Sequence, residues 1–226
     1  MSKFLMIFSI VVLMIFSLSV SAQRFKPGLV IGGVSSDLVG VDPYDDDFSK
    51  AGFTAGALLN TKFSEKNSFQ FEILFTDRGT LQKPDSLNNY TLYKLSLDYV
   101  DVPLMFKHNF IFNVGKKRVD RFSFEIGPSY SRLVRVSQTG TYGGFYDNNF
   151  NSNDFALNVG LGCRIMHNLS LNVRYSNSII PIVPHPTYIN SYFWYSFNKG
   201  DNVWFSFSLR YVFSNEKDKG GEKTSD

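Results

Sequence analysis

The chain has 226 residues, of which 43% are hydrophobic and 19% charged, and its formal net charge is +3. This polarity excludes a bundle of transmembrane helices, each of which needs about 20 consecutive apolar residues, and the weak positive charge gives no basis for nucleic-acid binding. The single cysteine, Cys163, excludes an internal disulfide, and no Cys/His group has the spacing of a metal site, so we expect no metal and no cofactor.

The first 22 residues have the features of a secretion signal. Lys3 precedes an apolar run over residues 4–20, and the small residues Ser21 and Ala22 form a cleavage pattern. We expect export, with cleavage after Ala22 and Gln23 as the new N-terminus. The apolar run is slightly long for a signal peptide, which leaves an uncleaved anchor as the alternative.

Alternation of apolar and polar residues predicts three strands in the first part of the mature chain. Successive strand side chains point to opposite faces, so a period of two gives one apolar and one polar face. The first expected strand covers residues 24–36, and an acidic connection, residues 37–49, separates it from the second, residues 50–64. After a tight turn, the third strand has large apolar residues on one face: Phe69, Phe71, Ile73 and Phe75. Its other face carries Gln70, Glu72, Leu74 and Thr76.

The fourth expected strand, residues 92–110, contains a change of apolar phase. Its apolar residues occupy odd positions from Tyr93 to Tyr99 and then even positions from Val100 to Phe106. We interpret this one-residue slip as a β-bulge that keeps both groups on one apolar face. Pro103, which lacks an N–H for the ladder, comes just after it.

Four further strands are expected at residues 122–130, 155–165, 169–176 and 203–213. The connections alternate between long and short, as in outer-membrane barrels with short periplasmic turns and longer external loops. We therefore predict an all-β fold, an eight-stranded antiparallel up-and-down transmembrane β-barrel over residues 23–213, followed by a polar disordered tail over residues 214–226. The last strand is expected to pair with the first around residues 29–34, which leaves no free edge.

The polar face of the predicted barrel carries charges of both signs. The large apolar side chains of eight strands would overfill so narrow a barrel, so we expect the apolar face to contact lipid and the polar face to line the lumen. Because buried charges need partners, we predict a structural network that plugs the lumen: Glu72, Asp101, Glu125, Arg164, Arg174 and Arg210. The alternatives are an ion path through the lumen, and a soluble periplasmic barrel with its apolar face inward.

The connection before the last strand is unusual because aromatic residues are concentrated in it. Aromatic side chains anchor protein interfaces, and we identify a candidate external interaction loop for a protein partner: Tyr188, Tyr192, Phe193, Trp194 and Tyr195. The alternative interpretation is that this segment extends the last hairpin and supplies the aromatic belt at the membrane interface.

Catalysis has little support in the sequence. The three histidines, His108, His167 and His185, are scattered over a strand end, a turn and a Pro-rich connection, and no G-x-S-x-G nucleophile motif occurs. We expect a non-enzymatic structural or interaction role, exerted through the external loops. The alternatives are a narrow pore or a transport or secretion accessory, and an enzyme with its site at the outer rim.

Several short motifs resemble the PorT-like outer-membrane β-barrel family of Bacteroidota. They occur at residues 52–56 (GFTAG), 69–75 (FQFEILF), 97–104 (LDYVDVPL), 127–130 (GPSY) and 157–162 (LNVGLG). The resemblance implies a barrel in the bacterial outer membrane, in contact with outer-membrane lipid, and it assigns no biological role. The closing Tyr211-Val212-Phe213 resembles the recognition signal of the barrel-assembly machinery. Such barrels often end at the terminal aromatic, whereas residues 214–226 follow it here.

Overall fold

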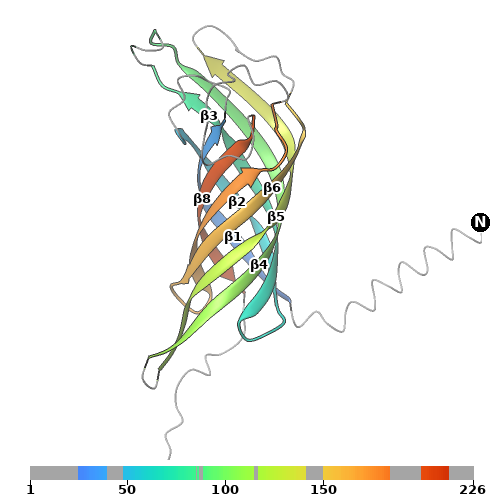
Figure 1. The fold of residues 1–226 in the computed structure, drawn as a ribbon, viewed down its shortest axis with the longest axis vertical. Coiled ribbons are helices and arrows are strands. Elements are labelled where there is room, and N and C mark those ends of the chain that lie inside the picture. Colours follow the sequence, from blue (N-terminus) through green and yellow to red (C-terminus); the bar gives the residue numbers. More distant parts are fainter. Residues whose placement is uncertain are drawn as a thin grey trace, which may run out of the picture.

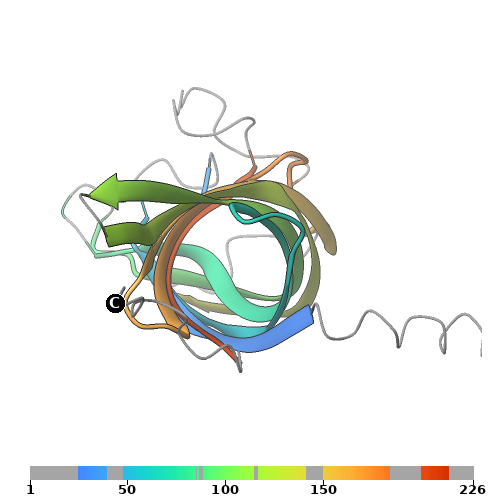
Figure 2. The same cartoon turned by 90° about the horizontal axis from the view of Figure 1, so that it is seen from below.

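The structure, a computed structural model, describes residues 25–39, 48–84, 86, 89–114, 117–140, 150–183 and 200–213. These residues form eight strands: β1 (Phe25–Leu38), β2 (Lys50–Lys62), β3 (Asn67–Gln82), β4 (Tyr93–Val114), β5 (Lys117–Gly140), β6 (Asn153–Arg164), β7 (Leu169–Ser178) and β8 (Asn202–Val212). Each strand pairs antiparallel with the next, and β8 pairs with β1, so the sheet closes into a barrel (Figures 1 and 2). The predicted fold class is confirmed.

Some predicted segments lie outside the described residues. They are the signal peptide, residues 1–22, and the polar tail, residues 214–226. In the part of the chain that the structure describes, no helix is long and apolar enough to cross a membrane.

The β1–β8 pair closes the barrel and confirms the predicted pairing of the first and last strands. The register is continuous from Gly28 to Leu38 of β1. The two backbones approach closely at Gly32, where a Cβ would lie 2.8 Å from Ser208 Cα and still closer to the Phe207 carbonyl oxygen. The absence of a side chain at position 32 therefore lets the two strands reach hydrogen-bonding distance at the closing seam.

Outward side chains are mostly apolar, and inward side chains are mostly polar. Ile31, Leu161 and Phe207 lie on the outer face, with 65%, 63% and 56% of their surface exposed. The inward-facing Glu125 and Arg174, by contrast, are 0% and 4% exposed. An apolar outer band around a polar interior is a feature of outer-membrane barrels, and it agrees with the predicted orientation of the two faces.

Aromatic side chains gather on the outer face at the short-turn end of the barrel. Phe63, Phe69 and Phe106 form a cluster with ring centroids 5.1, 5.9 and 6.2 Å apart. On β8, the rings of Tyr211 and Phe213 are 5.2 Å apart. Aromatic girdles of this kind lie at the membrane interface, so these rings mark the level at which the barrel leaves the hydrocarbon.

The hairpin of β4 and β5 is longer than the sequence pattern predicts. These strands have 22 and 24 residues, whereas about 9–11 residues are enough to cross a bilayer. At the short-turn end the hairpin reaches past its neighbours (Figure 1).

The β-bulge predicted in the fourth strand lies on the neighbouring strand instead. β4 keeps a single alternation, with its odd-numbered residues inward from Tyr93 to Asn109. A register shift does occur where Asp98 and Tyr99 pair with β5, but the extra residue is Val134 of β5. The change of apolar phase in β4 therefore has another cause.

That cause is an apolar layer inside the barrel at its long-loop end. The inward residues of β4 pack there against the end of β1 and the segment that follows β7, in a cluster that contains Leu38, Tyr93, Leu95, Leu97, Tyr99, Ile182 and Val183. Because β1 and β4 are three places apart in the ring, this cluster spans the lumen. The prediction that residues 93–99 belong to the lipid-facing surface is wrong, because the segment after β7 covers them from within. We call these seven residues the apolar layer.

Candidate functional site in the barrel lumen

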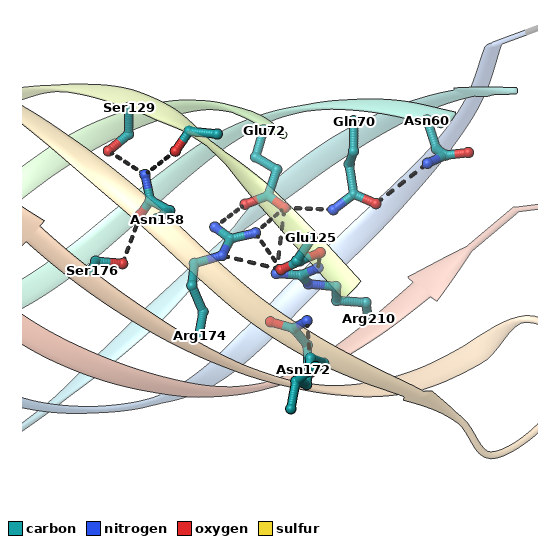
Figure 3. A network of polar contacts seen from close by, with 12 residues as sticks. Asn60, Gln70, Glu72, Glu125, Ser129, Asn158, Asn172, Arg174, Ser176 and Arg210 are labelled. Atoms are coloured by element: carbon teal, nitrogen blue, oxygen red, sulfur yellow. Dashed lines mark hydrogen bonds and ion pairs between the residues drawn. The ribbon is translucent and has the colours of Figure 1, made fainter. Parts of the chain in front are cut away.

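Four charged side chains from four strands meet in the lumen, and we call them the central cluster. Glu72 on β3 and Glu125 on β5 face Arg174 on β7 and Arg210 on β8 (Figure 3). Arg174 donates to both carboxylates: its Nη1 lies 2.9 Å from Glu72 Oε2, and its Nη2 lies 2.8 Å from Glu72 Oε1 and 3.0 Å from Glu125 Oε1. Arg210 Nη1 donates to Glu125 Oε2 at 2.7 Å, and its Nη2 lies 3.5 Å from Glu72 Oε1.

Neighbouring residues hold the central cluster in place. Gln70 donates to Glu72 Oε1 at 2.5 Å, and Asn60 in turn donates to Gln70 Oε1 at 3.5 Å (Figure 3). Gly160 on β6 lies beside Glu125, and a Cβ at this position would be 2.9 Å from Glu125 Cγ. The small residue on β6 therefore gives Glu125 the space to reach the two arginines.

The charges of the central cluster balance, with two carboxylates against two guanidinium groups. All four side chains are at most 4% exposed. Taking such ions out of water costs several kcal/mol each, and close charge-assisted hydrogen bonds are needed to offset that cost. Removing any one of the four would leave an uncompensated buried charge, so the cluster is a strong constraint on how the strands around it are arranged.

A second group of ion pairs, the upper cluster, lies nearer the long-loop end. Arg78 on β3 donates to Asp101 on β4 and, at 3.1 Å, to Asp154 Oδ2 on β6. Its guanidinium carbon also lies 4.2 Å from the ring centroid of Tyr99 and 3.7 Å from that of Trp204. The arginine is thus held by two carboxylates and stacked against two aromatic faces, an arrangement that favours Arg over Lys.

The space between the two clusters is small. A cavity of about 20 Å³ lies there, with Asp101 and Trp204 among its lining residues on one side and Arg174 and Arg210 on the other. This volume is little more than the roughly 10–15 Å³ that one water molecule needs. From the short-turn end to the long-loop end, the lumen therefore passes through the central cluster, this cavity, the upper cluster and the apolar layer.

The structure brings four of the six predicted lumenal residues together and separates the other two. Glu72, Glu125, Arg174 and Arg210 form the central cluster, whereas Asp101 belongs to the upper cluster. Arg164 lies at the short-turn end, where its Nη1 is 2.8 Å from Asp120 Oδ2 and both side chains are partly exposed. The six residues therefore belong to three separate ion-pair groups.

The residues behind the other functional hypotheses are placed only in part. The aromatic loop lies outside the described residues: Tyr188, Tyr192, Phe193, Trp194 and Tyr195. His185 lies outside them too. His108 Nδ1 is 2.7 Å from Asn67 Oδ1, and its ring packs edge-on against Phe110. Within the described ranges, no group of three or more His, Cys, Asp or Glu residues is placed to hold a metal ion.

Sequence reasoning missed several charged lumenal residues, among them Arg78, Asp154 and Lys107. The signal for Arg78 was present, because it has the same parity as Glu72 on β3, six positions further along. Asp154 likewise shares the inward parity of Asn158 on β6. Lys107 shares the inward parity of Asp101 on β4, and only the uninterrupted alternation of that strand makes the assignment clear.

Comparison with known proteins gives a family match over most of the chain. A family model described as "Outer membrane protein beta-barrel domain" matches residues 15–183. No curated protein matches the sequence.

Solved structures with a similar architecture include two bacterial surface proteins and a protease. The attachment invasion locus protein Ail of Yersinia pestis, in complex with the heparin analogue sucrose octasulfate, has 12% identity, with 84% of this chain and 99% of that chain covered and a TM-score of 0.41. Neisserial surface protein A has 13% identity, 84% and 97% coverage and a TM-score of 0.41. The outer membrane protease OmpT of Escherichia coli has 12% identity, 84% and 96% coverage and a TM-score of 0.25.

Proposed function

The chain belongs to the outer membrane protein β-barrel domain family, and we propose that in the bacterial outer membrane it has a non-enzymatic structural or interaction role, with a closed lumen and with external loops that contact other molecules. The barrel then serves as a rigid anchor in the lipid. The observation that carries the proposal is the stack of two ion-pair clusters across a lumen of only eight strands.

The size of the barrel and the side chains inside it support a closed lumen. Eight strands leave an interior that side chains can fill, whereas porins of about 16–18 strands enclose an aqueous channel. Here the central cluster joins β3, β5, β7 and β8, and the upper cluster joins β3, β4 and β6. The apolar layer adds a third obstacle, because an ion crossing it would lose its hydration without gaining a partner.

Conductance in a planar bilayer tests the closed lumen. The refolded full chain should give no discrete current steps, while a porin reconstituted in the same way shows that the assay detects channels. Regular unitary steps from the chain, retained when the preparation is purified further, would support the narrow-pore alternative and sink this part of the proposal.

The interaction role is assigned to the aromatic loop before β8. The proposal rests on its composition, since aromatic side chains are the usual anchors of protein interfaces. A photo-reactive amino acid at position 194, in whole cells, should yield a discrete adduct with a protein. Adducts with lipid alone would instead support the interfacial-belt interpretation of Tyr192, Phe193 and Tyr195.

The non-enzymatic part of the proposal concerns the histidines. An enzyme at the outer rim would need a base near the long loops, but His108 lies at the opposite, short-turn end beside Asn67. The proposal therefore predicts that neither His108→Gln nor His185→Gln changes the growth of the cells or the composition of their lipids. Peptide or lipid turnover by the purified chain, lost in either variant, would establish the enzyme alternative.

The proposed biogenesis rests on two motifs, the apolar run that closes with Ser21-Ala22 and the aromatic Tyr211-Val212-Phe213. A signal peptide is removed after Ala22, and the barrel-assembly machinery receives the chain through Tyr211-Val212-Phe213. Within the family, the motifs at residues 97–104 and 157–162 support a PorT-like assignment. Mass spectrometry of the mature N-terminus tests the first step: a chain that still begins at Met1 in the outer membrane would support the uncleaved anchor.

A further inference from the structure

A cavity of about 120 Å³ occupies the lumen between the central cluster and the short-turn end. Its lining residues come from all eight strands and from the turn between β6 and β7. The basic members of this lining are Lys26, Lys62, Lys107, Arg121, Arg164 and His167. The remaining lining residues are Asn, Gln and Ser side chains, together with one Leu and one Val.

The charge of this cavity has one sign. Among the described residues that line it there is no Asp or Glu. The carboxylates closest to its inner end, Glu72 and Glu125, are already bonded to Arg174 and Arg210. Asp120 pairs with Arg164 at the rim, so that carboxylate does not offset the charge of Lys107 or Arg121.

Lys107 places a positive charge beside carboxylates that are already paired with other groups. It faces inward on β4, half-buried, directly across the strand pair from Glu125. Within the described part of the chain its ammonium group makes no hydrogen bond and no ion pair, and neither does the guanidinium of Arg121. The carboxylate that Lys107 faces, Glu125, is already bonded to Arg174 and Arg210. A partly buried ammonium with no hydrogen-bonded anion of its own is unfavourable, so an anion in the cavity would stabilise it.

We propose that this cavity is a binding site for a small multivalent oxyanion, of which a phosphate group is the type. Ammonium, guanidinium, amide and hydroxyl donors converge there, and these are the groups that recognise phosphate oxygens. The volume is several times the roughly 10–15 Å³ that holds one water molecule, so a phosphate group fits with some of its hydration. Cavity walls of low dielectric and one sign of charge also concentrate anions.

The site opens toward the periplasm and ends inside the barrel. Short turns of outer-membrane barrels face the periplasm, so the anion enters from that side, and the central cluster closes the inner end. The inference concerns a different part of the molecule from the external loops, and its test is independent of whether those loops bind a partner.

The test is calorimetric titration of inorganic phosphate into the refolded full chain in a non-ionic detergent. Saturable binding is expected, and Lys107→Met should weaken it at least tenfold. The matched control is Lys66→Met, the same change of charge at an exposed position in the turn between β2 and β3 at the same end of the barrel, and it should leave the affinity unchanged. Arg121→Gln provides a second weakened variant should Lys107→Met not fold.

Several results would overturn the proposal. They are the absence of saturable phosphate binding by the wild type, equal weakening by Lys66→Met and Lys107→Met, and equal affinity for phosphate and acetate. The phosphate group could come from a lipid headgroup or from free phosphate, and titration of glycerol 1-phosphate distinguishes these two sources. Tighter binding of glycerol phosphate than of inorganic phosphate indicates a lipid headgroup, and the reverse indicates free phosphate; either preference supports the site.

Discussion

Replacing Arg174 with Leu is the most direct test of the central cluster. The change removes the hydrogen bonds at 2.8 and 2.9 Å to Glu72 and those at 3.0 and 3.2 Å to Glu125. Glu72 then keeps only Gln70 and the longer contact of 3.5 Å with Arg210. One negative charge is left uncompensated among four residues that are almost fully buried.

The expected loss follows from that uncompensated charge. Breaking a buried ion pair by removing one partner typically costs about 3–5 kcal/mol, and we expect the free energy of unfolding of Arg174→Leu to fall by this amount. The matched control is Arg164→Leu, because Arg164 also pairs with a carboxylate, that of Asp120, but the two side chains are 34% and 43% exposed. Its removal should cost no more than about 1 kcal/mol.

A double variant separates the charge effect from a loss of packing. Glu72→Leu combined with Arg174→Leu leaves a central cluster of balanced charge, in which Arg210 still bonds to Glu125 at 2.7 Å. The double variant should therefore be more stable than the sum of the single losses implies, by about 0.5–3 kcal/mol.

Urea-induced unfolding in lipid vesicles, followed by circular dichroism and by the heat-dependent gel shift of folded barrels, measures these differences. If Arg174→Leu unfolds at the same urea concentration as the wild type, the argument for a paired lumen fails. If instead the losses are additive in the double variant, the cost is one of packing, and the charge argument is wrong.

Three further predictions concern other parts of the barrel. Arg78→Lys should be destabilised nearly as much as Arg78→Leu, because an ammonium cannot bond to two carboxylates in a plane while stacked on Tyr99 and Trp204; full stability of the Lys variant in the same urea assay would contradict the stacking argument. Gly32→Val should fail to give the compact, heat-modifiable form, since its side chain collides with β8, and normal folding would show that the seam has space. Phe207→Arg, on the lipid-facing side of β8, should lose about 2–4 kcal/mol if it lies at the bilayer midplane; a neutral effect in vesicles would mean that Phe207 does not face hydrocarbon.

The barrel itself could be predicted because the strand alternation repeats in every segment. An alternation in one strand fits many folds, but eight such segments with alternately long and short connections fit few. The same parity rule placed Glu72, Glu125, Arg174 and Arg210 on the inner face. It could not say which would pair, because partners such as Glu72 and Arg174 are on strands that are not neighbours, and only the ring closure brings them together.

The errors have a common physical origin, namely the assumption of a lumen that is polar throughout. Leu95 and Leu97 were assigned to the lipid because they are apolar, and the resulting change of phase was explained by a bulge in β4. The lumen is instead apolar near the long loops, where Ile182 and Val183 fold back over these residues. Such an inward fold of a connection depends on contacts distant in sequence, which strand periodicity does not reveal.

The buried position of Trp204 makes its fluorescence an intrinsic probe of barrel closure. This indole is on β8, is 4% exposed and faces Arg78 of β3, whereas most aromatic side chains point outward to lipid. The fluorescence emission of Trp204 should therefore stay that of the unclosed barrel after the strands have entered the membrane. It should change only when β8 pairs with β1. In a chain that carries Trp194→Phe, the time course of this single fluorophore would separate insertion from sealing of the seam.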